Sequence, residues 1–429
     1  MARSSAPAPE PSAAARAVLV VDDSRAILAV LTALIERIPG VQVVTARSLA
    51  QARAALEEDA ARFFCAVVDL DLPDGPNGEI VDLVRRHPLA VIVLTGNDDA
   101  HQRERLLSGN VVDYIVKRNP AEIGYAGHLV AQLRENQSAR VLVVDDSSAF
   151  RAYLVRLLET YRYRVLQAAD GREAAAVLER EPDVSLVLTD VNMPVMGGAE
   201  LIERIRATHA REDLAVIALS DGARPERIAA LLRSGANDFI AKPFNVEEFF
   251  LRVTQNTTMV RQVRRIRQAA TRDYLTGLSN RRHFYELAQP LYENARRGNA
   301  LIALGMIDAD HFKRINDTFG HEVGDLALKQ IAQVLARTAR KADVLARFGG
   351  EEFVWLGMIK QPGDMQVMFE RARRAVEDGP LTIEGRGIGL SVSIGATCDA
   401  TGSLEQMLAR ADAGVYAAKN AGRNRVCVQ

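Results

Sequence analysis

The strongest chemical signal in this chain is a short run of two glycines and two carboxylates at residues 349–353 (GGEEF). Apolar residues flank the run, which predicts a β-hairpin with the glycines at its tip, where backbone can approach a phosphate closely. Glu351 and Glu352 would then present oxygen ligands for a metal ion. A solvated acidic turn is the competing interpretation, because so short a motif also arises by chance.

A further carboxylate group precedes this hairpin in the chain. Residues 301–307 form an apolar run that predicts a buried strand ending at Asp308, Ala309 and Asp310. A carboxylate at the end of a strand, opposite a hairpin that carries two more, can gather oxygen ligands for Mg²⁺ around a nucleoside triphosphate. The two segments together predict a metal-dependent nucleotide site.

These segments belong to a longer series of motifs. With residues 273–282 (DYLTGLSNRR), 308–325 (DADHFKRINDTFGHEVGD), 393–395 (SIG) and 418–424 (AKNAGRN), they resemble the GGDEF family of diguanylate cyclases over residues 271–429. The resemblance implies that two GTP molecules are joined into cyclic di-GMP with release of two pyrophosphates. Because each domain holds one GTP, it also implies a two-fold homodimer.

The resemblance implies metal and catalytic roles for particular residues. The ligands for two Mg²⁺ ions at each GTP site would be Asp308, the Ala309 carbonyl, Glu351 and Glu352. Glu351 also matches the base for the ribose 3′-hydroxyl, and Lys313 matches the cation that stabilises charge on the phosphates.

Other residues match the contacts of the family with GTP, namely Phe312, Asn316, Asp325, Lys419 and Arg423. Asn316 and Asp325 match the residues that read guanine, although Asp325 could instead cap a helix beginning at Leu326. Lys419 and Arg423 stand four apart, so we expect them on one helical face toward the β and γ phosphates. An ordinary solvated basic face is the alternative for that pair.

Residues 340–343 (RKAD) resemble the RxxD inhibitory site of the family, where cyclic di-GMP binds and halts the enzyme. Arg340 and Asp343 would form this site together with Arg371. The arginine fork suits a phosphate or the acceptor edge of guanine. A charged helix end is the bland alternative.

The first part of the chain contains an internal repeat. Residues 18–24 (VLVVDDS) recur at 141–147, and each copy continues through further apolar runs that end in polar residues. Those residues are Asp69, Thr95 and Lys117 in one copy and Asp190, Ser220 and Lys242 in the other. Functional residues at successive strand ends predict a parallel doubly wound sheet with a site at its carboxyl edge.

Clustered carboxylates at such an edge imply Mg²⁺, one ion for each copy. The two triads are Asp22, Asp23 and Asp69, and Asp145, Asp146 and Asp190. A carboxylate can attack phosphorus, and a hydroxyl and an ammonium could bind the new phosphoryl oxygens. Helix capping by the Asp-Asp-Ser run is the alternative, but it explains one Asp of each copy.

The repeated unit resembles the receiver domains of two-component response regulators. Asp69 and Asp190 would accept phosphate from a histidine kinase or phosphotransfer protein. Lys242 precedes Pro243, as is usual in the family, whereas Lys117 precedes Arg118, so we expect the turn at the first switch to differ. Two receivers followed by a GGDEF domain is the layout of PleD-type cyclases.

The expected fold class is α/β. A tail at 1–15 precedes two flavodoxin-like receivers with doubly wound parallel sheets, at 16–136 and 139–258, and a GGDEF domain at 271–429 whose palm-like sheet contains antiparallel strands. Residues 246–272 lack Gly and Pro and predict one linking helix. Its apolar stripe fits either a short coiled coil or packing on its own domain. The stripe consists of Val253, Val260, Val263, Ile266 and Ala270.

Composition limits the alternatives. A net charge of −1 gives no argument for nucleic-acid binding, and no apolar run is long enough to span a membrane. Without a signal-peptide pattern, a cytoplasmic protein with buried thiols at Cys65 and Cys398 is expected. A catalytically inert cyclic di-GMP-binding regulator and a phosphorelay scaffold are the rival functions.

Overall fold

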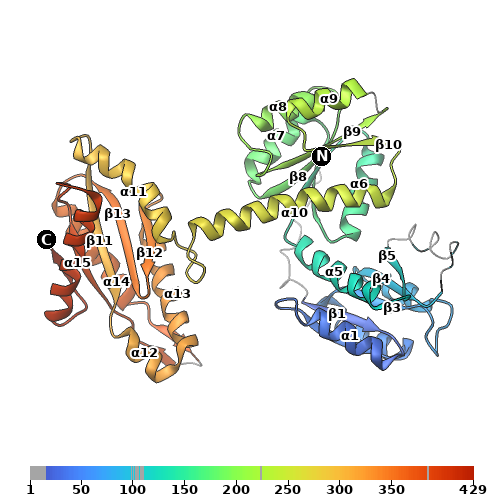
Figure 1. The fold of residues 1–429 in the computed structure, drawn as a ribbon, viewed down its shortest axis with the longest axis horizontal. Helices are drawn as coiled ribbons and strands as arrows, with labels where there is room; N and C mark the ends of the chain where they lie inside the picture. The colour runs from blue at the N-terminus through green and yellow to red at the C-terminus, as the bar shows by residue number, and fades with distance from the viewer. Residues whose placement is uncertain are drawn as a thin grey trace, which may run out of the picture. The chain divides into compact units, whose positions relative to one another are not determined.

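The computed structural model describes residues 16–429 apart from residues 98, 100, 102–105, 107–110, 223–224 and 384–385. The tail expected at 1–15 lies outside the described residues. Tertiary contacts divide the chain into two compact units, Met1–Val263 and Arg264–Gln429 (Figure 1). The domain limits predicted inside the first unit are finer than this division and stay predictions.

The first receiver is a parallel five-stranded sheet with the strand order β2-β1-β3-β4-β5. Its strands are β1 (Ala17–Val21), β2 (Gln42–Ala46), β3 (Phe63–Asp69), β4 (Ala90–Thr95) and β5 (Val111–Val116). Its helices are α1 (Arg25–Ile35), α2 (Leu49–Asp59), η1 (Ala60–Arg62), α3 (Glu79–Val84) and α5 (Pro120–Asn136). Strands β1, β3 and β4 are buried along their whole length because apolar clusters cover both faces, which explains their unbroken apolar sequences.

The second receiver repeats this topology with the order β7-β6-β8-β9-β10. Its strands are β6 (Arg140–Val144), β7 (Arg164–Ala168), β8 (Val184–Asp190), β9 (Ala215–Asp221) and β10 (Asp238–Lys242). Its helices are α6 (Ser148–Thr160), α7 (Gly171–Arg180), α8 (Gly198–Arg206), α9 (Pro225–Ser234) and α10 (Val246–Thr271). The sequence prediction of two flavodoxin-like sheets is confirmed, and the carboxyl ends of their strands carry the predicted polar residues.

Helix α10 is the continuous helix that the sequence predicts, but its apolar stripe is divided. Val253 and Val260 are fully buried in the core of the second receiver. Ile266 is 68% exposed, and Ala270 is exposed as well. The first half of the stripe therefore packs on its own domain, as the alternative interpretation has it.

Within the first unit, the turn after α6 contacts the first receiver. The Tyr161 hydroxyl donates to the Val112 carbonyl at 2.8 Å, and its ring stacks on Phe250 of α10 with centroids 3.4 Å apart. Gln132 of α5 also donates to the Thr254 hydroxyl of α10 at 2.7 Å. Helix α10 thus touches the last helix of the first receiver as well as its own core.

The second unit is built on a mixed sheet with the order β12-β13-β11-β16-β17. Its strands are β11 (Leu301–Ala309), β12 (Val344–Gly349), β13 (Glu352–Ile359), β16 (Val392–Thr397) and β17 (Val426–Val428), beside a small hairpin of β14 (Leu381–Ile383) and β15 (Arg386–Ile388). Its helices are α11 (Arg281–Arg296), α12 (Phe312–Phe319), α13 (His321–Thr338), α14 (Gly363–Glu377) and α15 (Leu404–Asn420). All neighbouring strands of the large sheet are antiparallel except β16 and β17, so the predicted antiparallel-containing sheet is confirmed.

The central strand β11 is buried on both faces. Ala303 and Ile307 belong to the cluster that includes residues of α13 and α14, whereas Ile302 and Leu304 belong to the cluster that includes residues of α11 and α15. This alternation follows the two-residue period of a strand. Helices therefore cover both faces of β11 (Figure 1), and Asp308 is the penultimate residue of this strand.

The cysteines agree with expectation only in part. Cys65 is fully buried, and burial raises the pKa of its thiol, but Cys398 is only half-buried. All three cysteines are free. In the part of the chain that the structure describes, no helix combines the length and the apolar character needed to cross a bilayer.

Candidate active site and receiver sites

The predicted metal ligands of the second unit lie at one end of its sheet, although among the described residues the carboxylate oxygens of Asp308, Glu351 and Glu352 do not reach the 4.8 Å spacing found in the first receiver. Strands β11 and β13 pair in antiparallel register, which places Asp308 opposite Glu352. The Ala309 N–H donates to the Glu351 carbonyl at 3.2 Å, so the strand end and the hairpin tip are bonded directly. Residues that are distant in the sequence are thus neighbours in the sheet.

The hairpin tip has a feature that the sequence analysis missed. Gly350 has a φ of +45°, and Arg347 donates to its carbonyl from Nε at 2.9 Å and from Nη2 at 2.6 Å. The same guanidinium donates from Nη1 to Asp273 at 3.1 Å. The sequence signal for this contact is Arg347, two residues before Gly349, together with Asp273, the acid that opens residues 273–282. Arg347 therefore fixes the tip that carries Glu351.

Asp308 lies in an unbalanced electrostatic environment. Its side chain is buried; Oδ2 accepts from Lys419 Nζ at 2.8 Å, whereas Oδ1 is buried without a hydrogen-bond partner. Burial raises the Asp308 pKa, and the contact with Lys419 offsets this only in part. Burial and the nearby Asp308 charge also raise the pKa values of Glu351 and Glu352. An orphaned carboxylate oxygen beside two further acids fits Mg²⁺, which prefers oxygen ligands.

The residues expected to read guanine lie on the adjacent helix pair. Asn316 of α12 packs so closely against Gly324 of α13 that a Cβ at Gly324 would lie 1.8 Å from its Oδ1. The Phe312 ring borders the same glycine. Asp325, the next residue, lies inside α13, so the suggestion that it caps a helix beginning at Leu326 is wrong. Lys313, also on α12, is exposed.

The expectation that Lys419 and Arg423 share one helical face is wrong. Helix α15 ends at Asn420, and Gly422 follows with a φ of +110°. A glycine in this region ends a helix readily because it has no Cβ to clash. Arg423 itself has a φ of +63° and lies in a turn beyond the helix.

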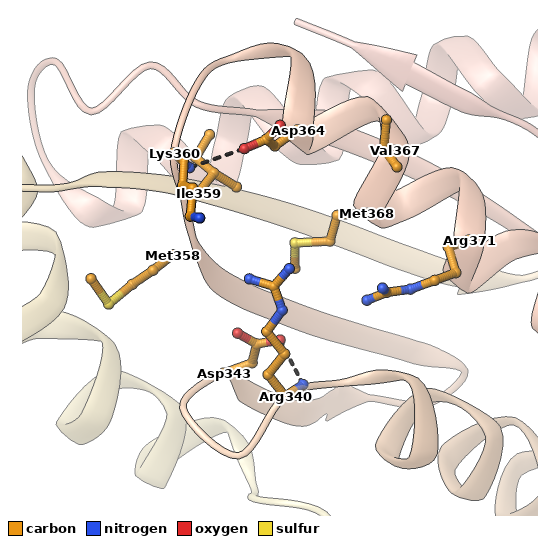
Figure 2. A pocket seen from close by; sticks show the side chains of 9 residues that line it. All are labelled: Arg340, Asp343, Met358, Ile359, Lys360, Asp364, Val367, Met368 and Arg371. Atoms are coloured by element: carbon orange, nitrogen blue, oxygen red, sulfur yellow. Dashed lines mark hydrogen bonds between the residues drawn. The ribbon is translucent and has the colours of Figure 1, made fainter.

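The three residues of the predicted inhibitory site line one pocket (Figure 2). Asp343 Oδ2 accepts from the Arg340 N–H at 2.9 Å and from the Trp355 indole at 3.1 Å, so this oxygen is occupied within the domain. Arg371 donates to the Thr338 carbonyl at 3.2 Å. Sequence reasoning missed most of the pocket, which is lined by Arg340, Asp343, Met358, Ile359, Lys360, Asp364, Val367, Met368 and Arg371.

The first receiver brings its predicted acids together. Ligand oxygens of Asp22, Asp23 and Asp69 lie within 4.8 Å of one another, an arrangement suited to a divalent cation. Lys117 Nζ is 2.6 Å from Asp22 and 2.7 Å from Asp69. Burial raises the Asp22 pKa, against the effect of Lys117, and Thr95 is buried at the end of β4.

The second receiver shows a related arrangement. Lys242 Nζ lies 3.0 Å from Asp145 and 2.6 Å from Asp190, and Ser220 is buried at the end of β9. Asp146 is exposed, and this triad does not reach the spacing of the first one among the described residues. The peptide bond before Pro243 is cis, whereas the one after Lys117 is not, so the two switch turns differ as the sequence predicts.

Family models match the segments of the chain that carry these sites. The response regulator receiver domain matches residues 18–124 and 141–254, and the diguanylate cyclase GGDEF domain matches residues 270–425. Together, the folds and sites define a two-receiver response regulator with a GGDEF output domain.

Comparison with individual relatives shows which type of response regulator this chain resembles. The chain is 31% identical over 338 residues to the response regulator PleD of Caulobacter vibrioides, covering 74% of this chain and 72% of PleD. It is 43% identical over 162 residues to the diguanylate cyclase DgcP of Pseudomonas aeruginosa, covering 37% of this chain and 24% of DgcP. A solved response regulator/GGDEF domain protein is 34% identical, with a TM-score of 0.53, and the match covers 57% of this chain and 99% of that one. The chain belongs to the response-regulator diguanylate cyclases of the PleD type.

Proposed function

We propose that this diguanylate cyclase joins two GTP molecules into cyclic di-GMP in a pair of its GGDEF domains, under the control of receiver phosphorylation and of its own product. The observation that carries the proposal is the buried, unpartnered Oδ1 of Asp308 beside Glu351 and Glu352. Three neighbouring carboxylates repel one another and do not stabilise the fold, but they suit a metal-bound triphosphate.

The reaction requires one proton acceptor and one leaving group in each half. The ribose 3′-oxygen of one GTP forms a bond to the α phosphorus of the other, the bond from that phosphorus to the bridging oxygen breaks, and pyrophosphate leaves. The hydroxyl proton passes to Glu351, whose raised pKa suits a general base. Repetition from the second nucleotide closes the ring, which is why two domains must face each other.

Other residues bind and orient GTP. Asp308, the Ala309 carbonyl, Glu351 and Glu352 would hold Mg²⁺. When bound, Mg²⁺ would lower the pKa of the attacking hydroxyl and screen phosphate charge. In this proposal, the cations on the triphosphate are Lys313, Lys419 and Arg423, and the guanine contacts are Phe312, Asn316 and Asp325.

Specificity follows from the chemistry of the purine edge. The Asp325 carboxylate can accept from the N1 and N2 hydrogens of guanine, which adenine does not offer. Asn316 lies against Gly324, the residue that precedes Asp325 in α13. GTP is therefore the proposed substrate rather than ATP.

Receiver control would act through the lysine contacts. Lys117 and Lys242 now pair with the acceptors Asp69 and Asp190, and a phosphoryl group would supply stronger acceptor oxygens for them. Thr95 and Ser220, buried at the ends of neighbouring strands, would bind the same group. The phosphate donor is a cognate histidine kinase or phosphotransfer protein, and activation raises the effective concentration of paired GGDEF domains.

The central experiment supplies purified protein with GTP and Mg²⁺, with and without beryllofluoride as a phosphoryl mimic, and identifies the product. We expect cyclic di-GMP, formed faster with the mimic. Asp69→Asn and Asp190→Asn variants show which receiver carries the response, and Glu351→Gln should abolish synthesis while GTP still binds.

Two outcomes would contradict this scheme. Tight binding of cyclic di-GMP without GTP consumption would make the protein an inert regulator. Phosphotransfer to both receivers without any effect on the third domain would instead make it a phosphorelay scaffold.

Product inhibition is proposed from the pocket of Figure 2. Arg340→Ala removes a guanidinium that can grip a phosphate or guanine, so the cyclic di-GMP concentration for half-inhibition should rise about ten-fold or more. Turnover in the initial phase should stay unchanged. Arg374→Ala is the matched control, because Arg374 is on the same helix as Arg371 but does not line the pocket. Equal inhibition of wild type and Arg340→Ala would refute the assignment.

A further inference from the structure

Asp310 is neither one of the proposed metal ligands nor the proposed general base, so its hydrogen bonds point to another role. Its side chain is 6% exposed, and it accepts from Ser393 Oγ at 2.6 Å, from Ser391 Oγ at 2.9 Å and from the Asn424 N–H at 3.0 Å. All three donors are neutral. A buried carboxylate is costly, so such a group is retained where its hydrogen bonds hold something in place.

The segment that Asp310 holds is the turn after α15, defined here as Gly422–Asn424. The φ angles of Gly422, Arg423 and Asn424 are +110°, +63° and +44°. Two successive residues with side chains in the left-handed region are strained, and such a conformation persists only where the surroundings impose it.

Several hydrogen bonds impose this left-handed conformation on the turn Gly422–Asn424. The Arg423 N–H donates to the Ala418 carbonyl at 3.0 Å. The Asn424 side chain accepts from Arg373 Nη1 at 2.7 Å and donates to Glu377 Oε1 at 2.6 Å. The turn is therefore tied to α15, to α14 and, through Asp310, to the end of β11.

The Arg423 side chain differs from its neighbours. Among the described residues, its guanidinium has no ion pair or hydrogen bond, and it is half-buried. The backbone around it is thus fixed while its charge remains available.

We propose that Asp310 is a positioning residue for the nucleotide: by fixing the Asn424 N–H it holds the left-handed turn that presents Arg423 to the triphosphate. This inference rests on the proposed phosphate-binding role of Arg423. Asp308 and Asp310 stand two residues apart, at the end of β11 and just beyond it, so one segment sets both the metal ligand and the anchor of the phosphate-binding turn. The two residues of chain from Asp308 to Asp310 and the hydrogen bond from the Asn424 N–H to Asp310 then connect the end of β11 to the turn that carries Arg423.

The test separates binding from chemistry by using 3′-deoxy-GTP with Mg²⁺, which lacks the attacking hydroxyl and cannot react. Asp310→Ala should weaken binding of this probe about ten-fold and raise the KM for GTP by a similar factor, with a smaller change in kcat. Arg423→Ala should do the same. The double variant should be no worse than either single one, because both changes remove the same contact.

Conservative variants distinguish positioning from general support. Asp310→Asn keeps an acceptor for the Asn424 N–H and should recover most of the affinity for 3′-deoxy-GTP. Ser393→Ala removes one donor to Asp310 but leaves the Asn424 contact, so its affinity should stay within about two-fold of wild type even if its Tm falls. Thermal unfolding and cyclic di-GMP binding at the separate pocket verify folding of each variant.

Wild-type affinity in a folded Asp310→Ala protein, or fully additive losses in the double variant, would overturn the proposal. If Asp310→Ala does not fold, Asp310→Asn and Asp310→Ser decide it, because the amide keeps an acceptor near the Asn424 N–H whereas the shorter serine side chain withdraws it. Weakened probe binding in Asp310→Ser alone supports positioning, and equal binding in both variants refutes it. A wild-type protein that binds 3′-deoxy-GTP but makes no cyclic di-GMP would refute the proposed function while leaving this comparison valid.

Discussion

At the scale of single residues, a lysine ammonium neutralises acidic oxygens at each of the three sites. Lys117, Lys242 and Lys419 lie within 3.0 Å of an aspartate in the first receiver, the second receiver and the catalytic domain. For Lys117, burial by itself would lower the pKa, but its hydrogen bonds to Asp22 and Asp69 outweigh burial and raise it. Under the proposed function, each lysine would exchange its aspartate for phosphate oxygens.

The raised carboxyl pKa values predict how Mg²⁺ stabilises the protein. Because Asp308, Glu351 and Glu352 bind protons more tightly when folded, their contribution to stability is present at acid pH and is lost as pH rises through the raised values. Mg²⁺ competes with those protons, so the Tm increase that it causes should grow across the same window. Thermal unfolding with and without Mg²⁺, at a series of pH values from mildly acidic to neutral, measures this increase.

The receivers also contribute to that Mg²⁺ response, because Asp22 has a raised pKa too. The control is therefore Asp308→Asn, in which the catalytic part of the Mg²⁺ effect should disappear. A Tm increase that does not change with pH would count against the carboxylate cluster as the binding site.

Arg347 gives a second prediction at this scale. Arg347→Ala removes two bonds to the Gly350 carbonyl and the ion pair with Asp273, so the hairpin that carries Glu351 should lose its fixed position. We expect kcat to fall about ten-fold or more, since small displacements of catalytic groups are costly. Steady-state kinetics measure the effect, and a variant with unchanged kcat would exclude the clamp. Exposed Arg282, whose one ion-pair partner among the described residues is Glu286 of its own helix, is a suitable alanine control.

At the scale of elements, the α12–α13 pair depends on one glycine. Gly324→Ala would put a Cβ 1.8 Å from Asn316 Oδ1 and 3.3 Å from the Phe312 ring, so the Asn316 side chain must leave its present position. The KM for GTP should rise and discrimination against ATP should fall, although alanine favours a helix more than glycine does. Competition assays with both nucleotides measure this.

Gly363→Ala is the matched control for that change. Gly363 begins α14, and a Cβ there would meet nothing within 4 Å. A Gly324→Ala protein that retains the wild-type KM and preference would show that Asn316 does not read the base.

At the scale of the whole molecule, the two receivers form one unit through Tyr161 and α10. Helix α5 begins shortly after Lys117 and contacts α10, which continues past the last residue of the first unit. A conformational change at Lys117 of the first receiver could therefore reach the linking helix α10 directly through α5. A change in the second receiver reaches α10 because this helix is part of that receiver.

Tyr161→Ala should destabilise this unit by about 3 kcal/mol, because it removes a half-buried ring and a hydrogen bond, whereas Tyr161→Phe should cost about 1 kcal/mol. The sole tryptophan, Trp355, is buried in the catalytic domain and reports that domain alone. In urea, the far-ultraviolet circular dichroism transition should shift in Tyr161→Ala while the tryptophan fluorescence transition stays in place. Parallel shifts of both signals would contradict independent unfolding of the two units.

The sequence alone determined the parallel sheets and the strand-end acids, because apolar runs and the residues that follow them are local patterns. The mixed sheet was expected only from the resemblance to the GGDEF family. Asp69 and Asp190 could be placed from a repeat, and Asp308 and the hairpin from strand periodicity. Antiparallel pairing of β11 with β13 in the observed register then places Asp308 opposite Glu352.

Tertiary structure decided the features that depend on contacts between distant segments. The clamp of Arg347 on Asp273, the anchor of Asp310 on Asn424 and the burial of only half of the α10 stripe each join residues with no fixed spacing in sequence. The end of α15 before Arg423 likewise reflects a left-handed turn that its partners stabilise. Sequence periodicity reports which face of an element is apolar, but only packing determines what covers that face and which polar group receives each hydrogen bond.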